Sequence, residues 1–277
     1  MIKQAIIPLA GLGTRMLPLT SVMPKELLPL NGRPNIEYVM DECIEAGIKK
    51  FIFIISKKKE SIRRYFFNDA FYEKIIKKKK DKLIIAEFKR IKKYQKMIRF
   101  VYQNKPKGTG DAILKCKKLI KDNYFMMLLP DDLIIKKNCS KEMIKLHLKT
   151  KSSIIATKTV NKKTVSRWGI LSVKEKKKNY FKINDVVEKP SFNKAPSNYA
   201  IIGRYILPRQ IFKEIKKLKP GKNGEIHITD AIKNLIKENN LFFANIFQGK
   251  YLDCGTLKGY INSCKEIAKG KKWNYAW

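Results

Sequence analysis

The residues with the clearest chemical potential lie in one stretch near the start of the chain. After the apolar run AIIP, two glycines stand one residue apart, at Gly11 and Gly13, and Arg15 follows them. Because neither glycine carries a Cβ, the backbone can turn sharply there and direct its N–H groups toward an anion. Lys25 adds an ammonium to the guanidinium of Arg15. A planar guanidinium, which can donate two parallel hydrogen bonds, and a compact ammonium on one loop suit the binding of a triphosphate.

The amino-acid sequence of this loop excludes two common phosphate-binding motifs. A dinucleotide fingerprint needs a third glycine where this chain has Met16. A P-loop needs Gly-Lys-Ser/Thr after its first glycine, and the loop lacks that sequence. A glycine pair after a strand can also be an ordinary turn. The phosphate interpretation therefore depends on Arg15 and on the run Pro24, Lys25, Glu26.

The surrounding segments predict alternating strands and helices. Apolar runs indicate strands at 51–56, 98–102, 124–129 and 153–159, and a helical pattern covers 36–46. Continuous apolar runs are typical of parallel strands that are covered on both faces. A strand, a helix and a strand in this order place the glycine loop at the carboxyl end of a parallel strand, where ligands bind in such sheets.

Two of these strands end in further candidate residues. Strand 98–102 runs into Gln103, whose amide offers a donor and an acceptor to the edge of a pyrimidine. Asp131 follows strand 124–129 and should face the crevice, although such a residue is often only a loop or cap aspartate. Mg²⁺ is bound by one or two carboxylates together with substrate phosphates. We therefore expect Mg²⁺ at Asp131.

The spelling AGLGTRMLP followed by MPKELLPL resembles the signature of the sugar-phosphate nucleotidylyltransferases, most closely their bacterial UTP–glucose-1-phosphate uridylyltransferase branch. Further motifs follow in the family's order along the chain. The resemblance implies an α/β fold in which a Rossmann-like, mixed and mostly parallel central sheet is flanked by helices. It implies a single nucleotidyltransferase domain, 1–277, with a nucleotide-binding lobe over 1–150 and a sugar-binding lobe over 151–277.

The resemblance also assigns residues to two substrates. The nucleotide-binding positions that it implies are Ala10, Gly11, Gly13, Glu26, Gln103 and Gly108. The sugar-binding positions that it implies are Asp132, Gly169, Glu188, Asn198 and Gly203. Glu188 can accept hydrogen bonds from sugar hydroxyls while Lys189 neutralises phosphoryl groups, although an exposed ion pair is the plainer alternative. We expect Trp168 to pack rather than to stack on a ligand, and Thr229 to cap a helix.

The implied activity is uridylyl transfer from UTP to α-D-glucose 1-phosphate, which gives UDP-glucose and pyrophosphate by direct in-line attack. Because the attacking oxygen is already anionic, no general base is required, and catalysis is positioning plus charge neutralisation. Arg15, Lys25 and Lys189 are the expected catalytic cations. The nearer alternative is another base or sugar, such as dTTP with glucose 1-phosphate. The family also suggests a homo-oligomer, a dimer or a tetramer.

Composition bounds the remaining possibilities. The net charge of +37 would suit a nucleic-acid-binding protein built around 74–96, but the positive residues are mostly lysines spread along the chain, where phosphate recognition favours arginine. We therefore expect solvated helices over 57–96 and no nucleic acid partner. Five widely spaced cysteines indicate neither a disulfide framework nor a zinc site. No window approaches the roughly 18 apolar residues of a membrane span, so a cytoplasmic protein without a membrane partner is expected.

Overall fold

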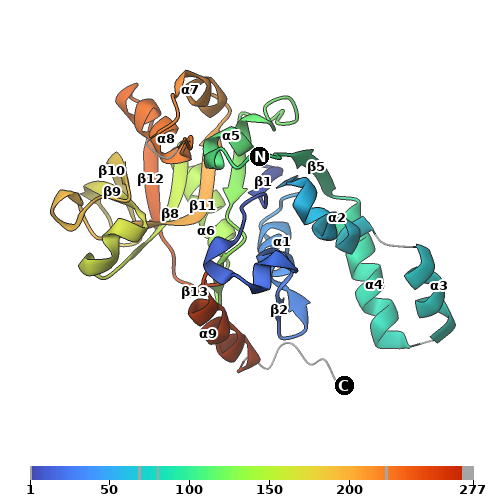
Figure 1. Ribbon diagram of the computed structural model, residues 1–277. Helices are drawn as coiled ribbons and strands as arrows, with labels where there is room; N and C mark the ends of the chain where they lie inside the picture. The colour runs from blue at the N-terminus through green and yellow to red at the C-terminus, as the bar shows by residue number, and fades with distance from the viewer. Residues whose placement is uncertain (1, 68–69, 80, 222–223, 270–277) are drawn as a thin grey trace.

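The computed structural model describes residues 2–67, 70–79, 81–221 and 224–269. A nine-stranded sheet runs through this part of the chain (Figure 1). Its strands, in spatial order, are β5 (Ile98–Tyr102), β4 (Lys50–Ile55), β1 (Gln4–Pro8), β6 (Tyr124–Leu128), β11 (Tyr199–Pro208), β8 (Ser153–Thr159), β12 (Phe242–Ile246), β10 (Tyr180–Glu188) and β9 (Gly169–Lys176).

The directions of pairing divide the sheet into two parts. β5, β4, β1 and β6 are parallel to one another. β11 is antiparallel to β6 and β8, and β10 is antiparallel to β12 and β9, whereas β12 and β8 are parallel. The sheet is therefore mixed, and the predicted α/β fold class is confirmed. Parallel pairing prevails in the first part, where the apolar runs of the sequence are continuous.

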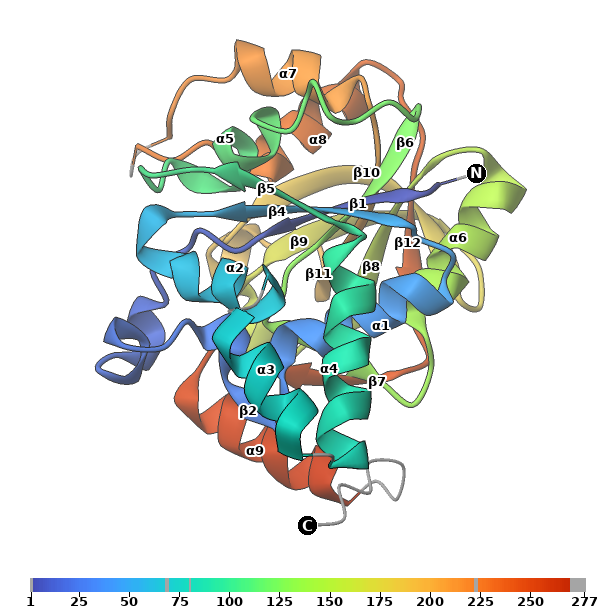
Figure 2. The same ribbon diagram turned by 90° about the vertical axis from the view of Figure 1, so that its right-hand side faces the viewer.

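Helices cover both faces of the sheet (Figure 2). One face carries α5 (Gly108–Leu114), α7 (Ile211–Lys217) and α8 (Ile228–Lys237), and the other carries α1 (Asn35–Glu45), α2 (Glu60–Phe67), α4 (Lys82–Gln95) and α6 (Cys139–Thr150). Successive residues of β1 point to opposite faces, so Ile6 joins one buried cluster and Ile7 the other. The glycine loop therefore leaves a strand that is fixed from both sides.

The lysine-rich region folds as the helices that its spacing predicts. α3 (Ala70–Lys79) and α4 extend from the body of the molecule (Figure 1). Asp81 caps α4 by accepting hydrogen bonds from the N–H groups of Leu83 and Ile84. The far end of α4 is anchored, because the Tyr94 hydroxyl donates to Asp41 of α1 at 2.5 Å. This region is a helical excursion that is tied to the core at its end.

Shorter elements complete the fold. β7 (Asp132–Ile135) pairs with β13 (Lys250–Asp253), and β2 (Pro29–Leu30) pairs with β3 (Arg33–Pro34). The last described helix, α9 (Leu257–Ala268), has its N-cap at Thr256. Short 3-10 helices are η1 (Thr14–Met16), η2 (Leu19–Ser21), η3 (Lys25–Leu27), η4 (Lys57–Lys59), η5 (Lys162–Arg167) and η6 (Phe192–Lys194).

One capping prediction is wrong. α8 begins at Ile228 with His227 as its N-cap, so Thr229 lies inside the first turn. The Thr229 hydroxyl donates instead to Glu188 Oε2 at 3.0 Å. Nothing in the sequence marks that contact, because the two residues lie on different elements.

Three broader expectations have different outcomes. All five cysteines are free thiols, as their spacing predicts. Within the described ranges, no helix has both the length and the apolar composition that crossing a membrane requires. Strands from 1–150 and from 151–277 share one sheet, and the division into a nucleotide lobe and a sugar lobe stays a prediction.

Candidate active site

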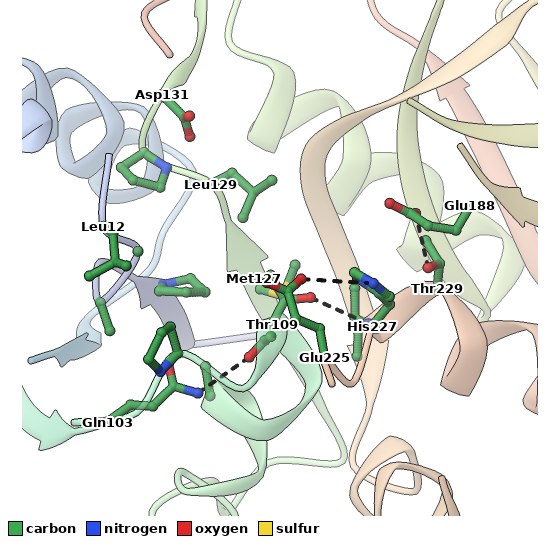
Figure 3. Close-up of a pocket in the computed structure, with 18 of the residues that line it drawn as sticks. Leu12, Gln103, Thr109, Met127, Leu129, Asp131, Glu188, Glu225, His227 and Thr229 are labelled. Carbon is green, nitrogen blue, oxygen red and sulfur yellow. Dashed lines mark hydrogen bonds and ion pairs between the residues drawn. The ribbon is translucent and has the colours of Figure 1, made fainter. Parts of the chain in front are cut away.

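A cleft of about 580 Å³ opens where several strands end. Ala10 and Gly11 reach it from the end of β1, Gln103 from the end of β5, and Asp131 from the end of β6. Figure 3 shows Gln103 at one end of the cleft and Glu188 at the other. A second cavity, of about 180 Å³, adjoins the first, because both are lined by residues such as Asp131 and Glu188.

The backbone of the glycine loop turns sharply, as its sequence predicts. Gly13 has φ +71°, in the left-handed region, and its carbonyl accepts a hydrogen bond from the Thr20 hydroxyl at 2.8 Å. A Cβ on Gly13 would lie 3.2 Å from Thr20 Cβ, whereas a Cβ on Gly11 would meet no atom within 4 Å. Gly13 therefore shapes the turn, and Gly11 leaves the cleft open to a ligand.

Two of the predicted cations meet at Asp131. Lys25 Nζ lies 2.6 Å from Asp131 Oδ2, and Arg15 Nη2 lies 3.5 Å from the same oxygen. Burial opposes both charges of the Lys25–Asp131 pair. The attraction outweighs it, so the pKa of Lys25 is raised and the pKa of Asp131 is lowered. Both groups are therefore held ionised.

Lys189 reaches the cleft from the facing wall. Its backbone has φ 44°, and its N–H donates to the Trp168 carbonyl at 2.9 Å. Its side chain is 57% exposed, with Nζ 3.6 Å from Glu188 Oε1. Lys25, Asp131 and Lys189 all line the larger cavity, and Arg15 lines the smaller one beside Asp131. The predicted cations therefore converge on one continuous space.

Gln103 and Gly108 form the end of the cleft that we expect to hold the base. The buried Gln103 amide donates to Asp111 Oδ2 at 2.7 Å and to the Gly108 carbonyl at 3.3 Å, which fixes its orientation. Gly108 has φ +91°, and a Cβ there would lie 2.5 Å from the Ile226 carbonyl. Only glycine allows this close approach of the two backbones.

Glu26 has a partner that the sequence analysis missed. Lys59 Nζ donates to both Glu26 carboxylate oxygens, at 2.7 and 2.8 Å, and both side chains are buried. Burial lowers the pKa of Lys59, and the nearby Glu26 carboxylate opposes that shift. Glu26 lines the cleft, but this pair also holds η3, which carries Lys25. No local sequence signal distinguishes Lys59 from the lysines beside it.

Most of the predicted sugar-binding residues line the smaller cavity. Asp132, Gly169, Glu188 and Gly203 do so. Among the described residues that line the two cavities, Asn198 is absent, and its amide donates to the Val160 carbonyl at 3.3 Å.

Two glycines allow the carboxylates of this cavity to approach the backbone. A Cβ on Gly203 would lie 2.4 Å from Leu129 Cβ and 2.6 Å from Asp132 Oδ2. A Cβ on Gly169 would lie 3.2 Å from Glu188 Oε2. Asp132 accepts hydrogen bonds from the Gly203 N–H at 3.0 Å and the Tyr251 hydroxyl at 2.6 Å. Burial, reinforced by Asp131, raises the pKa of Asp132 to about 6.

Several cavity residues were not predicted. Thr229 bonds to Glu188, and Trp168 both lines the smaller cavity and packs edge-to-face on Tyr251, with ring centroids 6.0 Å apart. The pairing of β7 with β13 sets Asp253 opposite Asp132. A carboxylate followed by Cys-Gly at a strand end is a signal comparable to that of Asp131, and it could have identified Asp253.

The residues present fit a hard divalent cation. A Cβ on Gly255 would lie 2.6 Å from Asp131 Oδ2, 2.8 Å from Arg15 Nη2 and 3.3 Å from Asp253 Oδ1, so only glycine lets these two carboxylates come this close to the backbone. Among the residues with described positions, no group of three or more His, Cys, Asp or Glu forms a complete metal cage. Two carboxylates beside a phosphate site suit Mg²⁺, which completes its shell with substrate phosphates and water.

The fold and the site define the class of protein. Residues 4–270 match the profile described as Nucleotidyl transferase, and the chain belongs to this family. Among its curated relatives, the UTP–glucose-1-phosphate uridylyltransferase of Pseudomonas aeruginosa is 38% identical over 96% of this chain and 97% of its own length. The enzyme of the same name from Bacillus subtilis is 35% identical over 98% of this chain and 92% of its own length.

Solved structures agree with these relatives. A UDP-glucose pyrophosphorylase complexed with UDP-glucose has a TM-score of 0.87 and 36% identity, and the match covers 97% of this chain and 99% of that one. The UTP-bound UGPase from Acinetobacter baumannii has a TM-score of 0.89 and 33% identity, and the match covers 98% and 95%. The resemblance drawn from the sequence motifs is confirmed.

Proposed function

We propose that this protein is an enzyme that transfers the uridylyl group of UTP to α-D-glucose 1-phosphate, giving UDP-glucose and pyrophosphate. The observation that carries the proposal is the convergence of Lys25, Asp131 and Lys189 on one cleft, with Arg15 beside Asp131 in the adjoining cavity. Gln103 at the far end supplies a place for the base. The names of the relatives support the choice of uracil and glucose.

The chemistry needs charge neutralisation more than proton transfer. A phosphate oxygen of the sugar ester forms a bond to the α-phosphorus of UTP while the bond between that phosphorus and the bridging oxygen of pyrophosphate breaks. The attacking oxygen is an anion, so the main obstacle is repulsion between two phosphate groups. Fixed cations in a partly dehydrated cleft lower this repulsion without reorganising during the reaction.

Each cation has a place in this scheme. Lys189 lies beside Glu188 on the sugar side and would draw the sugar phosphate toward the nucleotide. Lys25 and the exposed Arg15 lie on the glycine-loop side and would hold the departing pyrophosphate. Glu188, fixed by Thr229, would accept hydrogen bonds from glucose hydroxyls.

Asp131 and Asp253 are the residues that would hold Mg²⁺, and the bound ion would neutralise phosphate charge. The Lys25–Asp131 pair keeps the carboxylate ionised and therefore ready to act as a ligand. We further propose that the enzyme works in the cytoplasm as a homo-oligomer, and that its basic surface is solvated rather than bound to nucleic acid.

A substrate panel tests the proposal. Pyrophosphate release is measured with UTP or dTTP, each with several sugar 1-phosphates, with and without Mg²⁺. We expect release with UTP, glucose 1-phosphate and Mg²⁺ together, and a much lower kcat/KM with dTTP. Preference for dTTP or for another sugar would replace the substrate assignment. No release with any pair, together with submicromolar, salt-sensitive binding of nucleic acid, would favour a polyanion-binding protein.

A further inference from the structure

A fully buried arginine lies on β11, the strand that carries Gly203 and pairs with β6. Arg204 belongs to β11, directly after Gly203, and its side chain has no solvent exposure. It lines neither cavity among the described lining residues, so it is placed to act on a substrate only through other groups.

The guanidinium of Arg204 holds the backbone that leads to Asp131. Its Nη1 donates to the Leu129 carbonyl at 3.0 Å and to the Gly203 carbonyl at 3.1 Å. The Leu129 N–H also donates to the Gly203 carbonyl, at 2.8 Å. Pro130 follows Leu129 and has no N–H to donate. The hydrogen bonds of Leu129 are therefore the last backbone anchors of this segment before Asp131.

The charge of Arg204 is balanced by Glu42 of α1. Arg204 Nε and Nη2 donate to Glu42 Oε2 at 3.1 and 2.9 Å. Glu42 Oε1 accepts hydrogen bonds from the N–H and the hydroxyl of Ser140, at 3.1 and 2.6 Å. Burying such a pair costs solvation that well-packed apolar side chains would avoid, so stability alone gives little reason for it.

The pair has one property that apolar packing lacks, which is the ability to donate hydrogen bonds to two chosen carbonyls. Those carbonyls belong to Leu129 and Gly203, which both line the smaller cavity and flank Asp131 and Asp132. On its other side the segment is held where the Cys254 N–H donates to the Asp131 carbonyl at 2.7 Å. Arg204 therefore supplies one of the contacts that fix the backbone around the expected metal ligand.

We propose that Arg204, held by Glu42, is a positioning residue that sets the backbone of 129–131 and thereby the affinity of Asp131 for the divalent cation. This inference rests on the proposed function for its role in turnover. Loss of the two carbonyl contacts should release the segment, so cation binding weakens although no ligand is changed. Binding of the base at Gln103 and Gly108 should be unaffected.

Two alterations separate positioning from folding. In Arg204→Met/Glu42→Met the buried charges are removed together, so no unpaired charge remains and the fold should survive. In Arg204→Lys the charge remains, but the guanidinium that pairs with Glu42 while its Nη1 donates to both carbonyls is lost. Arg33→Lys is the matched control, because Arg33 is equally buried and paired with Glu37 yet lies on β3, away from the cleft.

The measurement is Mn²⁺ binding, monitored through the EPR signal of the free ion with and without UDP-glucose, together with the Mg²⁺ concentration for half-maximal turnover. We expect both Arg204 variants to bind Mn²⁺ at least tenfold more weakly and to need correspondingly more Mg²⁺, with Arg33→Lys unchanged. Wild-type Mn²⁺ affinity in a folded Arg204 variant would overturn the inference, as would an equal loss in Arg33→Lys. If the double variant does not fold, Arg204→Lys decides.

The two proposals fail in different ways. If the wild-type protein releases no pyrophosphate from UTP, the proposed function is wrong, but the comparison of Mn²⁺ affinities still reports whether Arg204 positions the cation ligand. If the wild type is active and the Arg204 variants bind Mn²⁺ normally, only the positioning role is wrong.

Discussion

The ammonium of Lys25 lies 2.6 Å from a carboxylate oxygen of Asp131, and this contact joins η3 to the segment that follows β6. The two residues are far apart in the chain but fill the same part of the cleft. The pair keeps a lysine charged in a place that is only 14% exposed, where the phosphates of a nucleotide would meet it. A fixed positive charge at this point is available before the substrate arrives.

Lys25→Met should therefore reduce turnover without abolishing the fold. We expect kcat to fall by a factor of about 10² to 10³, which corresponds to roughly 3 kcal/mol of lost transition-state stabilisation. The measurement is steady-state pyrophosphate release at saturating UTP and glucose 1-phosphate. Lys25→Arg keeps the charge and should recover part of the loss. Equal rates in the wild type and Lys25→Met would show that this lysine has no catalytic role.

The pair of Lys59 and Glu26 should matter mainly for stability. Lys59→Met leaves a buried carboxylate without its cation, which costs about 3 to 5 kcal/mol in the free energy of unfolding. The double variant Lys59→Met/Glu26→Gln removes both charges and should recover most of that loss. Urea denaturation of the wild type, Lys59→Met, Glu26→Gln and the double variant gives the coupling free energy of the pair. If the two single losses simply add in the double variant, the buried pair is not an energetic unit.

Gly203→Ala should damage the sugar side of the site. The added Cβ would lie 2.4 Å from Leu129 Cβ, a distance that forces the backbone or Asp132 to move. We expect KM for glucose 1-phosphate to rise at least tenfold while KM for UTP changes little. Gly221→Ala is the control, because its Cβ would meet the Glu225 carbonyl at an ordinary 3.5 Å. A normal KM for glucose 1-phosphate in Gly203→Ala would show that a Cβ at this position does not disturb the sugar side of the site.

Asp132 should make stability depend on pH. Burial and the neighbouring Asp131 raise its pKa to about 6 in the folded state, above the value of about 3.9 in an unfolded chain. The folded state therefore holds the proton more tightly, and the Asp132 contribution to stability declines as pH rises through this window. Asp132→Asn should gain stability relative to wild type by about 2 kcal/mol between pH 4.5 and pH 8. A difference in Tm that does not change with pH would contradict this assignment.

The parts of the fold that could be predicted are those with local patterns. The strand before Gly11, the helix after Pro34 and the apolar run at β4 each show their period or capping signal within a few residues. Asp131 was predictable for the same reason, because a carboxylate at the end of a buried strand needs no distant partner to be noticed.

The residues that were missed depend on contacts distant in the sequence. Lys59 is one lysine among several until η3 brings Glu26 to it. Asp253 ends a strand, which is a local signal, but its place opposite Asp132 follows only from the pairing of β13 with β7. Arg204 interrupts an apolar strand, and its role is visible only with Glu42 and Leu129 in place. Thr229 was assigned to a cap because its helix was predictable and its contact with Glu188 was not.

The most direct measurement is the rate of pyrophosphate release from UTP and glucose 1-phosphate in Mg²⁺, compared between the wild type, Asp131→Ala and Lys189→Ala. The account predicts release by the wild type and a fall of about 10² to 10³ in kcat/KM for each variant, since each removes one of the charges that let two phosphate esters meet. Near-normal turnover in either variant would contradict it.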